Sequence, residues 1–335
     1  MEEFLTIDTI IYLIVIIISI PIVVFNTNNY YIIDNLKCQL EKIKMRFLKL
    51  YIYIKIKAFG YKIVEAYGYE QKTINELNKI DNDTNNFYNY KGLNFLSKLS
   101  SKNKNLVICF HGAIPHGRKF NAIFRGYNYI IDNTDIICIS DYLLTKYKDN
   151  YTVNWTLSTK KHPNLDLLYK ELFEYIINIK KYKNIVFTGT SAGGFPSLKF
   201  GSFFNSTVII SNSQLYIENY VNNVGIKSLS TYIDNDDEVI YENKMIEKIL
   251  LQSKPKQIIY YQNKQDIGPS PHNSYGDCIQ FKNFLESNNL ENICEFLIFN
   301  LDKQVSQPKA HEAHGIYFPN KKKHAYILRE FIKNN

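Results

Sequence analysis

The sequence predicts an α/β fold in which helices cover both faces of a mostly parallel sheet. From about residue 62 onward, short apolar runs alternate with longer segments of helical periodicity. The runs are apolar throughout and do not alternate with polar residues, which is typical of strands buried on both faces. No internal repeat or low-complexity linker interrupts this region. We therefore expect one domain over residues 62–335.

The individual elements follow from the same patterns. The expected strands are the apolar runs at 105–110, 135–140, 184–188, 207–211, 257–262 and 293–299. Apolar residues recur at helical spacing from Leu165 to Ile179, behind a helix start at Pro163-Asn164. Further helices are expected over 239–251 and 320–332.

The N-terminal segment predicts a membrane anchor over residues 1–35. No charged residue lies between Asp8 and Asp34, and the run from Ile10 to Ile33 is long enough to span a bilayer as a helix. Its high content of β-branched residues leaves a buried strand pair with a turn at Pro21 as the alternative.

Flanking charges orient this anchor. Glu2 and Glu3 precede the run, whereas basic residues are frequent after it, so the following domain is expected on the cytoplasmic side. Residues 36–61 are basic and amphipathic, and they predict a helical stem that either lies on anionic lipid or is a solvated linker.

Charge and cysteine content exclude several classes of protein. The net charge of +8 comes from scattered lysines, without the basic stripe and interleaved aromatics of a nucleic-acid reader. The five cysteines form no CxxC or Cys/His pattern, so we expect no disulfide framework, no metal site and no cofactor. Asn is used heavily throughout, which indicates nucleotide bias in the coding genome, and Asn-rich stretches are given less weight for that reason.

A Gly-x-Ser-x-Gly motif stands where a nucleophile is expected. Ser191 lies between Gly189 and Gly193, directly after the strand expected at 184–188 and before a helix start near Pro196. A serine hydroxyl needs a base and oxyanion donors to become a nucleophile, and a strand-turn-helix exposes it for both. A glycine-rich phosphate loop is the alternative, but the Lys that P-loops place before Ser/Thr is absent.

The oxyanion donors are expected on two small-residue turns. The backbone N–H of Ala192 follows the nucleophile, and Gly112 and Ala113 follow the strand at 105–110. His111 is interpreted as a structural residue of this loop, because the base should come later in the chain.

The acid and the base are expected in the order Ser, acid, His. Asp266 follows the strand at 257–262 and is our candidate acid, with Asp236 and Asp237 as alternatives. His314 is our candidate base, and His311 stays open because both lie in the region that this order requires. The remaining histidines are expected at the surface: His116, His162, His272 and His324.

With these features in order, the chain resembles the α/β-hydrolase superfamily from about Lys62 to its C-terminus. The resemblance implies an α/β-hydrolase fold, a Ser191-Asp266-His314 triad and an oxyanion hole formed by Ala192 and the Gly112-Ala113 loop. Three runs also look like a bacterial group found with surface-polysaccharide biosynthesis: 110–113, 260–266 and 313–319. The chain departs from common esterases because it lacks an HGGG-type loop.

We therefore expect a serine hydrolase or acyl transferase that acts through an acyl-enzyme on a small-molecule or glycan ester. The alternative is a non-catalytic, membrane-associated accessory protein that retains the fold. Residues 142–155 and 212–237 are the segments expected to border the substrate.

Overall fold

The computed structural model divides the chain into two units, Met1–Tyr61 and Lys62–Asn335, and the description below concerns the second. The structure describes residues 71–73, 84–113, 124–126, 129–146, 153–219, 239–242, 244–268, 273–301, 306, 310–311 and 324–335. The predicted membrane anchor, the stem, His116, Asp236, Asp237, His272 and His314 lie outside these residues. Among the described helices, none is long and apolar enough to cross a membrane.

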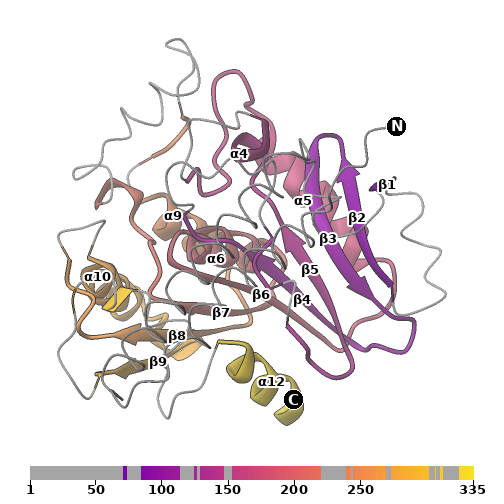
Figure 1. Ribbon diagram of the computed structural model, residues 1–335. Helices are drawn as coiled ribbons and strands as arrows, with labels where there is room; N and C mark the ends of the chain where they lie inside the picture. The colour runs from indigo at the N-terminus through magenta and orange to yellow at the C-terminus, as the bar shows by residue number, and fades with distance from the viewer. Residues whose placement is uncertain are drawn as a thin grey trace, which may run out of the picture. The chain divides into compact units, whose positions relative to one another are not determined.

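One sheet of nine strands organises the described part of this unit, in the order β1-β2-β3-β5-β4-β6-β7-β8-β9 (Figure 1). The strands are β1 (Gln71–Thr73), β2 (Thr84–Tyr90), β3 (Leu93–Leu99), β4 (Asn105–Phe110), β5 (Thr134–Ile139), β6 (Asn184–Thr190), β7 (Thr207–Ser211), β8 (Gln257–Asn263) and β9 (Cys294–Phe299). The strands β4 to β9 are parallel, and β3 pairs antiparallel with both β2 and β5. The mostly parallel sheet predicted from the sequence is confirmed.

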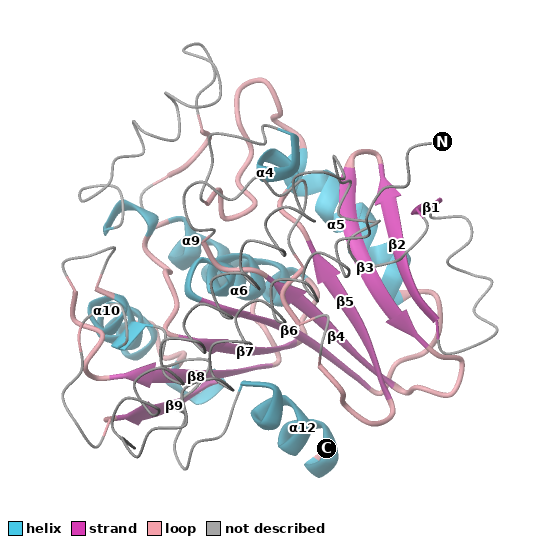
Figure 2. Ribbon diagram, in the orientation of Figure 1, coloured by secondary structure: helices cyan, strands magenta, loops and turns pink. Residues whose placement is uncertain are grey.

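Helices lie on both faces of this sheet, as Figure 2 shows. The described helices are α4 (Tyr142–Lys146), α5 (Leu165–Ile177), α6 (Gly194–Phe203), α9 (Met245–Gln252), α10 (Ser274–Ser287) and α12 (His324–Asn334), with the 3-10 turns η2 (Ser191–Gly193) and η3 (Glu291–Ile293). Along β4, Leu106, Ile108 and Phe110 pack in the core with α5, α6, α9 and α10, whereas Val107 and Cys109 pack in the core with α12. Successive strand residues point to opposite faces, so an unbroken apolar run is what a sheet covered on both sides requires.

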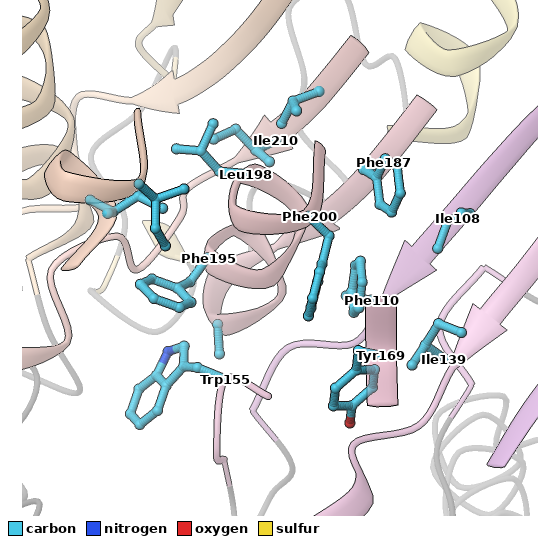
Figure 3. Close-up of a cluster of buried hydrophobic side chains, with 14 of the residues drawn as sticks. Ile108, Phe110, Ile139, Trp155, Tyr169, Phe187, Phe195, Leu198, Phe200 and Ile210 are labelled. Atoms are coloured by element: carbon cyan, nitrogen blue, oxygen red, sulfur yellow. The ribbon is translucent and has the colours of Figure 1, made fainter. Parts of the chain in front are cut away.

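Aromatic side chains fill the larger core, between the sheet and helices α5 and α6 (Figure 3). The ring of Phe200 on α6 lies 5.9 Å from Phe110 and 5.0 Å from Phe173, measured between centroids. Close packing of this kind fixes α6 against the sheet. The 3-10 turn η2, which precedes α6 and carries Ser191, is therefore held on a rigid support.

The structure differs from the sequence predictions in one helix, three strands and one histidine. The helix expected from residue 239 begins only at Met245, because Val239 forms an isolated antiparallel bridge with Thr159. The sequence analysis did not predict β1, β2 or β3. The last predicted helix is described from His324, and residues 320–323 lie outside the described residues. His324 was expected at the surface, and this was wrong: its side chain is buried, with Nε2 2.6 Å from the Thr188 hydroxyl oxygen.

Candidate active site

The Gly-x-Ser-x-Gly segment forms a sharp turn between β6 and α6. Ser191 follows the last residue of β6 and has a φ of +56°, a left-handed conformation that is rare for residues other than glycine. Such strain is concentrated at functional sites, where the surrounding structure maintains it. Ser191 is therefore held in the strained strand-to-helix turn expected of a nucleophile.

The glycines of the motif are needed for close backbone approach. A Cβ atom on Gly189 would lie 2.2 Å from the Gly193 carbonyl oxygen, and one on Gly193 would lie 2.8 Å from the carbonyl oxygens of Phe110 and His111. Neither contact can be relieved by turning a side chain, because both involve backbone atoms. The turn and the loop after β4 thus pack directly against each other.

Three side chains form a continuous hydrogen-bonded chain at the carboxyl ends of the parallel strands. The Ser191 hydroxyl oxygen lies 2.8 Å from Nε2 of His311, and Nδ1 of the same imidazole lies 2.7 Å from Oδ2 of Asp266. Asp266 lies three residues beyond β8, in the loop where the sequence analysis placed the acid. The Asp266 side chain is 2% exposed and that of His311 12% exposed, so the chain of contacts is largely shielded from water.

The histidine in this arrangement is His311, the alternative left open by the sequence, and not the first choice, His314. Among the described residues, His311 makes both of the contacts that a base between Ser191 and Asp266 requires. His314 lies outside the described residues. Two histidines three residues apart satisfy the same chain order, so only the fold of their segment could choose between them.

Asp266 has a further partner that the sequence analysis did not identify. The Ser274 hydroxyl donates to the same Oδ2 atom that His311 contacts, and Gln262 Nε2 donates to the Ser274 oxygen at 3.1 Å. Ser274 is the first residue of α10 and is fully buried. It fixes the orientation of the carboxylate, and a single Ser in the first turn of a helix offers no sequence signal for such a role.

His111 holds the loop that follows β4. The Asp141 backbone N–H donates to His111 Nε2 at 3.1 Å, so Nδ1 carries the proton and donates to the Gly112 carbonyl at 2.7 Å. Burial lowers the pKa of His111, which keeps the ring neutral. The C=O and N–H of a trans peptide point in opposite directions, so this bond also sets the direction of the Ala113 N–H. The structural role predicted for His111 agrees with these contacts.

The candidate oxyanion residues lie next to the nucleophile. A Cβ atom on Gly112 would lie 3.4 Å from the Cβ atom of Ser191, so the loop after β4 passes directly beside the elbow. Ala192 is the middle residue of the 3-10 turn η2, which continues into α6. Amide groups in the first turn of a helix have no partner within the helix and are available to an anion.

A small hollow adjoins Ala192. Its volume is about 10 Å³, which is room for about one water molecule. It is lined by Phe110, His111, Ile139, Asp141, Val153, Asn154, Trp155, Thr156, Ala192 and Pro196. The consecutive residues Trp155 and Thr156 both have a positive φ. This backbone is held by Asp141, whose Oδ2 accepts from the Thr156 N–H at 2.8 Å, and burial raises the pKa of Asp141.

Comparison with known proteins shows a likeness of fold. No protein-family model and no curated protein sequence matches the chain. A capsule O-acetyltransferase of Neisseria meningitidis serogroup A is similar in structure, with a TM-score of 0.50 and 17% identity over 74% of this chain and 94% of that one. The Staphylococcus aureus fluorophosphonate-binding serine hydrolase FphF is similar with a TM-score of 0.44 and 12% identity, over 69% and 94% of the two chains. Est1E from Butyrivibrio proteoclasticus is similar with a TM-score of 0.43 and 12% identity, over 75% and 96%.

The sheet order and the elbow of this chain identify its fold. A parallel sheet with helices on both faces and a strained Gly-x-Ser-x-Gly turn between strand and helix are the defining parts of one architecture. The chain has the α/β-hydrolase fold.

Proposed function

We propose that this protein is a serine hydrolase or acyl transferase that forms an acyl-enzyme on Ser191. The observation that carries the proposal is the uninterrupted chain from the Ser191 hydroxyl through His311 to Asp266. A serine, an imidazole and a carboxylate joined in this order are the groups that nucleophilic acyl transfer needs.

Each of the three residues then has a definite role. Asp266 accepts the Nδ1 proton of His311, which leaves the Nε2 lone pair facing Ser191. His311 takes the hydroxyl proton as Ser191 Oγ attacks the ester carbonyl, and it returns the proton to the departing alcohol. Water or a second alcohol then attacks the acyl-enzyme by the same steps in reverse.

The oxyanion formed in each attack requires donors beside Ser191. The backbone N–H groups of Ala192 and of the Gly112–Ala113 loop are the candidates, supported by the contact between that loop and the elbow. His111 contributes by fixing the Gly112 carbonyl.

For the substrate we propose an ester of a small molecule or a glycan. The support is the resemblance of residues 110–113 and 260–266 to proteins of surface-polysaccharide biosynthesis. The similar fold of the Neisseria meningitidis capsule O-acetyltransferase is consistent with this class.

A fluorophosphonate probe tests the proposal without knowledge of the substrate. Wild-type protein should be labelled covalently, and Ser191→Ala should not be labelled at all. His311→Ala should slow labelling by about 1,000-fold or more, since removal of one member of a triad costs most of its catalysis. The measurement is the second-order rate constant of labelling, followed by intact-protein mass spectrometry.

The variant His314→Ala decides between the two histidines. With His311 as the base, His314→Ala retains most of the labelling rate. Rapid labelling of His311→Ala together with slow labelling of His314→Ala would overturn the assignment, and equal labelling of wild type and Ser191→Ala would overturn the proposed function.

A further inference from the structure

Two buried asparagines lie at the carboxyl ends of neighbouring strands, beside the segment that carries His311. Asn212 directly follows β7 and Asn263 is the last residue of β8, and both side chains are fully buried. Asn212 Nδ2 donates to the His311 carbonyl at 2.9 Å and lies 3.4 Å from the Ala310 carbonyl. Asn263 Nδ2 donates to the Ala310 carbonyl at 2.9 Å. The backbone of residues 310–311 is thus bonded by two side-chain amides.

The orientation of each amide is fixed by a backbone donor on its other side. Asn212 Oδ1 accepts from the Asn263 N–H at 2.9 Å, and Asn263 Oδ1 accepts from the Gln265 N–H at 3.1 Å. The oxygen of each side chain therefore faces an N–H, and the nitrogen faces a carbonyl. If Oδ1 and Nδ2 of either amide were exchanged, the nitrogen would face an N–H and the oxygen would face a carbonyl. The hydrogen-bond partners are therefore consistent with only one orientation of each amide.

The two asparagines also link the acid loop to the histidine segment. Asn263 bonds to Gln265, next to Asp266, while its Nδ2 holds Ala310, next to His311. Asn212 has a φ of +41°, a conformation that Asn adopts more readily than most residues. Both sides of the His311–Asp266 contact are therefore attached to the same pair of strand ends.

We propose that Asn212 and Asn263 are positioning residues of the reaction: a two-amide clamp on the backbone of residues 310–311 that places the His311 imidazole between Ser191 and Asp266. The inference rests on the proposed function for its catalytic consequence, and on the hydrogen bonds above for the clamp itself. The Ala310 N–H also donates to the Ser306 carbonyl at 2.9 Å. Because the imidazole is attached to the backbone that the two amides hold, loss of a clamp amide should move the imidazole as well as lower stability.

Asn212→Asp and Asn263→Asp test the clamp with almost no change of shape. In each, an oxygen replaces Nδ2, so a donor to the backbone carbonyl becomes an acceptor that repels it. Asp also tolerates a positive φ, so the backbone of residue 212 gains no new strain. We expect kcat for p-nitrophenyl acetate and the rate of fluorophosphonate labelling to fall by about 100-fold, the cost of a misplaced catalytic group, while KM changes little.

Asn105→Asp is the matched control. Asn105 is also buried, and its Nδ2 donates to a backbone carbonyl, that of Asn133, at 3.0 Å. It is the first residue of β4, at the end of the sheet opposite Ser191. This variant should lose stability to a similar extent, by thermal melting, while keeping the wild-type kcat and labelling rate.

Proton NMR of protein labelled with ¹⁵N-histidine reads the clamp independently of activity. The His311 Nδ1 proton, bonded to Asp266, should give a downfield signal in wild type and in Asn105→Asp. This signal should be absent from both clamp variants.

If wild type shows this signal but is not labelled and does not hydrolyse the ester, the proposed function fails while the clamp is still tested. Asn212→Ser and Asn263→Ser, which keep a hydroxyl donor, provide milder variants should the Asp forms not fold. An unchanged signal and labelling rate in folded clamp variants, or an equal loss in Asn105→Asp, would overturn the proposal.

Discussion

Burial of the His324 imidazole links the stability of the fold to pH. The side chain is 4% exposed and packs between α12 and the sheet. Thr188 Oγ1 donates to the Ile209 carbonyl at 2.7 Å, so His324 Nε2 must donate to Thr188. Burial lowers the pKa of His324 to about 3, and the ring is therefore neutral near pH 7.

This lowered pKa predicts that the free energy of unfolding falls at acid pH, and that substitution of His324 reduces this fall. The unfolded chain takes up a proton on His324 below about pH 6.5, whereas the folded chain does not until about pH 3. The free energy of unfolding should therefore fall as the pH is lowered through this window, by up to about 1.4 kcal/mol per unit. His324→Gln keeps a donor for Thr188 and should show a shallower slope in urea denaturation between pH 7 and pH 5. His162→Gln, at a partly exposed histidine, is the control and should keep the wild-type slope.

The elbow between β6 and α6 is the element on which the site depends. It holds Ser191 at a positive φ, and its glycines let the turn approach the loop after β4. Position 193 is the sharpest test, because an added Cβ atom there would meet two carbonyl oxygens of the neighbouring loop at 2.8 Å.

Gly193→Ala should separate the elbow from the oxyanion loop. Overpacking of this kind costs about 1–3 kcal/mol of stability. Because the displaced backbone carries His111 and precedes Gly112, fluorophosphonate labelling should slow by more than stability alone explains. Ser202→Ala, further along α6, removes a hydroxyl bonded only locally to the Leu198 carbonyl and is the control. Equal labelling rates in the two folded variants would contradict this account of the elbow.

At the scale of the whole molecule, we propose that residues 10–33 anchor the protein in a membrane with the hydrolase domain on the cytoplasmic side. The support is the uncharged apolar run and the basic residues that follow it. Full-length protein should sediment with membranes and resist extraction by alkaline carbonate, whereas a chain without residues 10–33 should be released. In right-side-out vesicles, protease should leave the domain intact. Recovery of the full-length chain in the soluble fraction would refute the anchor.

Local patterns in the sequence determined much of the domain. The apolar runs at β4 to β8 predicted the parallel sheet, because strands buried on both faces leave little room for polar residues. The order of elbow, acid loop and late histidines predicted Ser191 and Asp266, since each follows a strand whose end the pattern marks. The strands β2 and β3 gave a weaker signal, in a chain where Asn is common throughout. Polar residues interrupt both strands: Asn85, Asn86 and Asn89 in β2, and Asn94, Ser97 and Lys98 in β3.

Tertiary structure alone decided which histidine meets Ser191, and which of the many asparagines matter. His311 and His314 satisfy the same chain order, and the contact is fixed by Asn212 and Asn263, which come from strands distant in sequence. Because Asn is common throughout the chain, the sequence analysis could not distinguish these two residues from the other asparagines. Composition does not show which side chains the fold buries. Likewise, Ser274 and His324 acquire their roles only from what packs against them. The periodicity of a segment reflects which of its side chains face the core. Which of several residues of the same type takes part in the site depends on contacts between segments distant in sequence, and no local pattern contains these contacts.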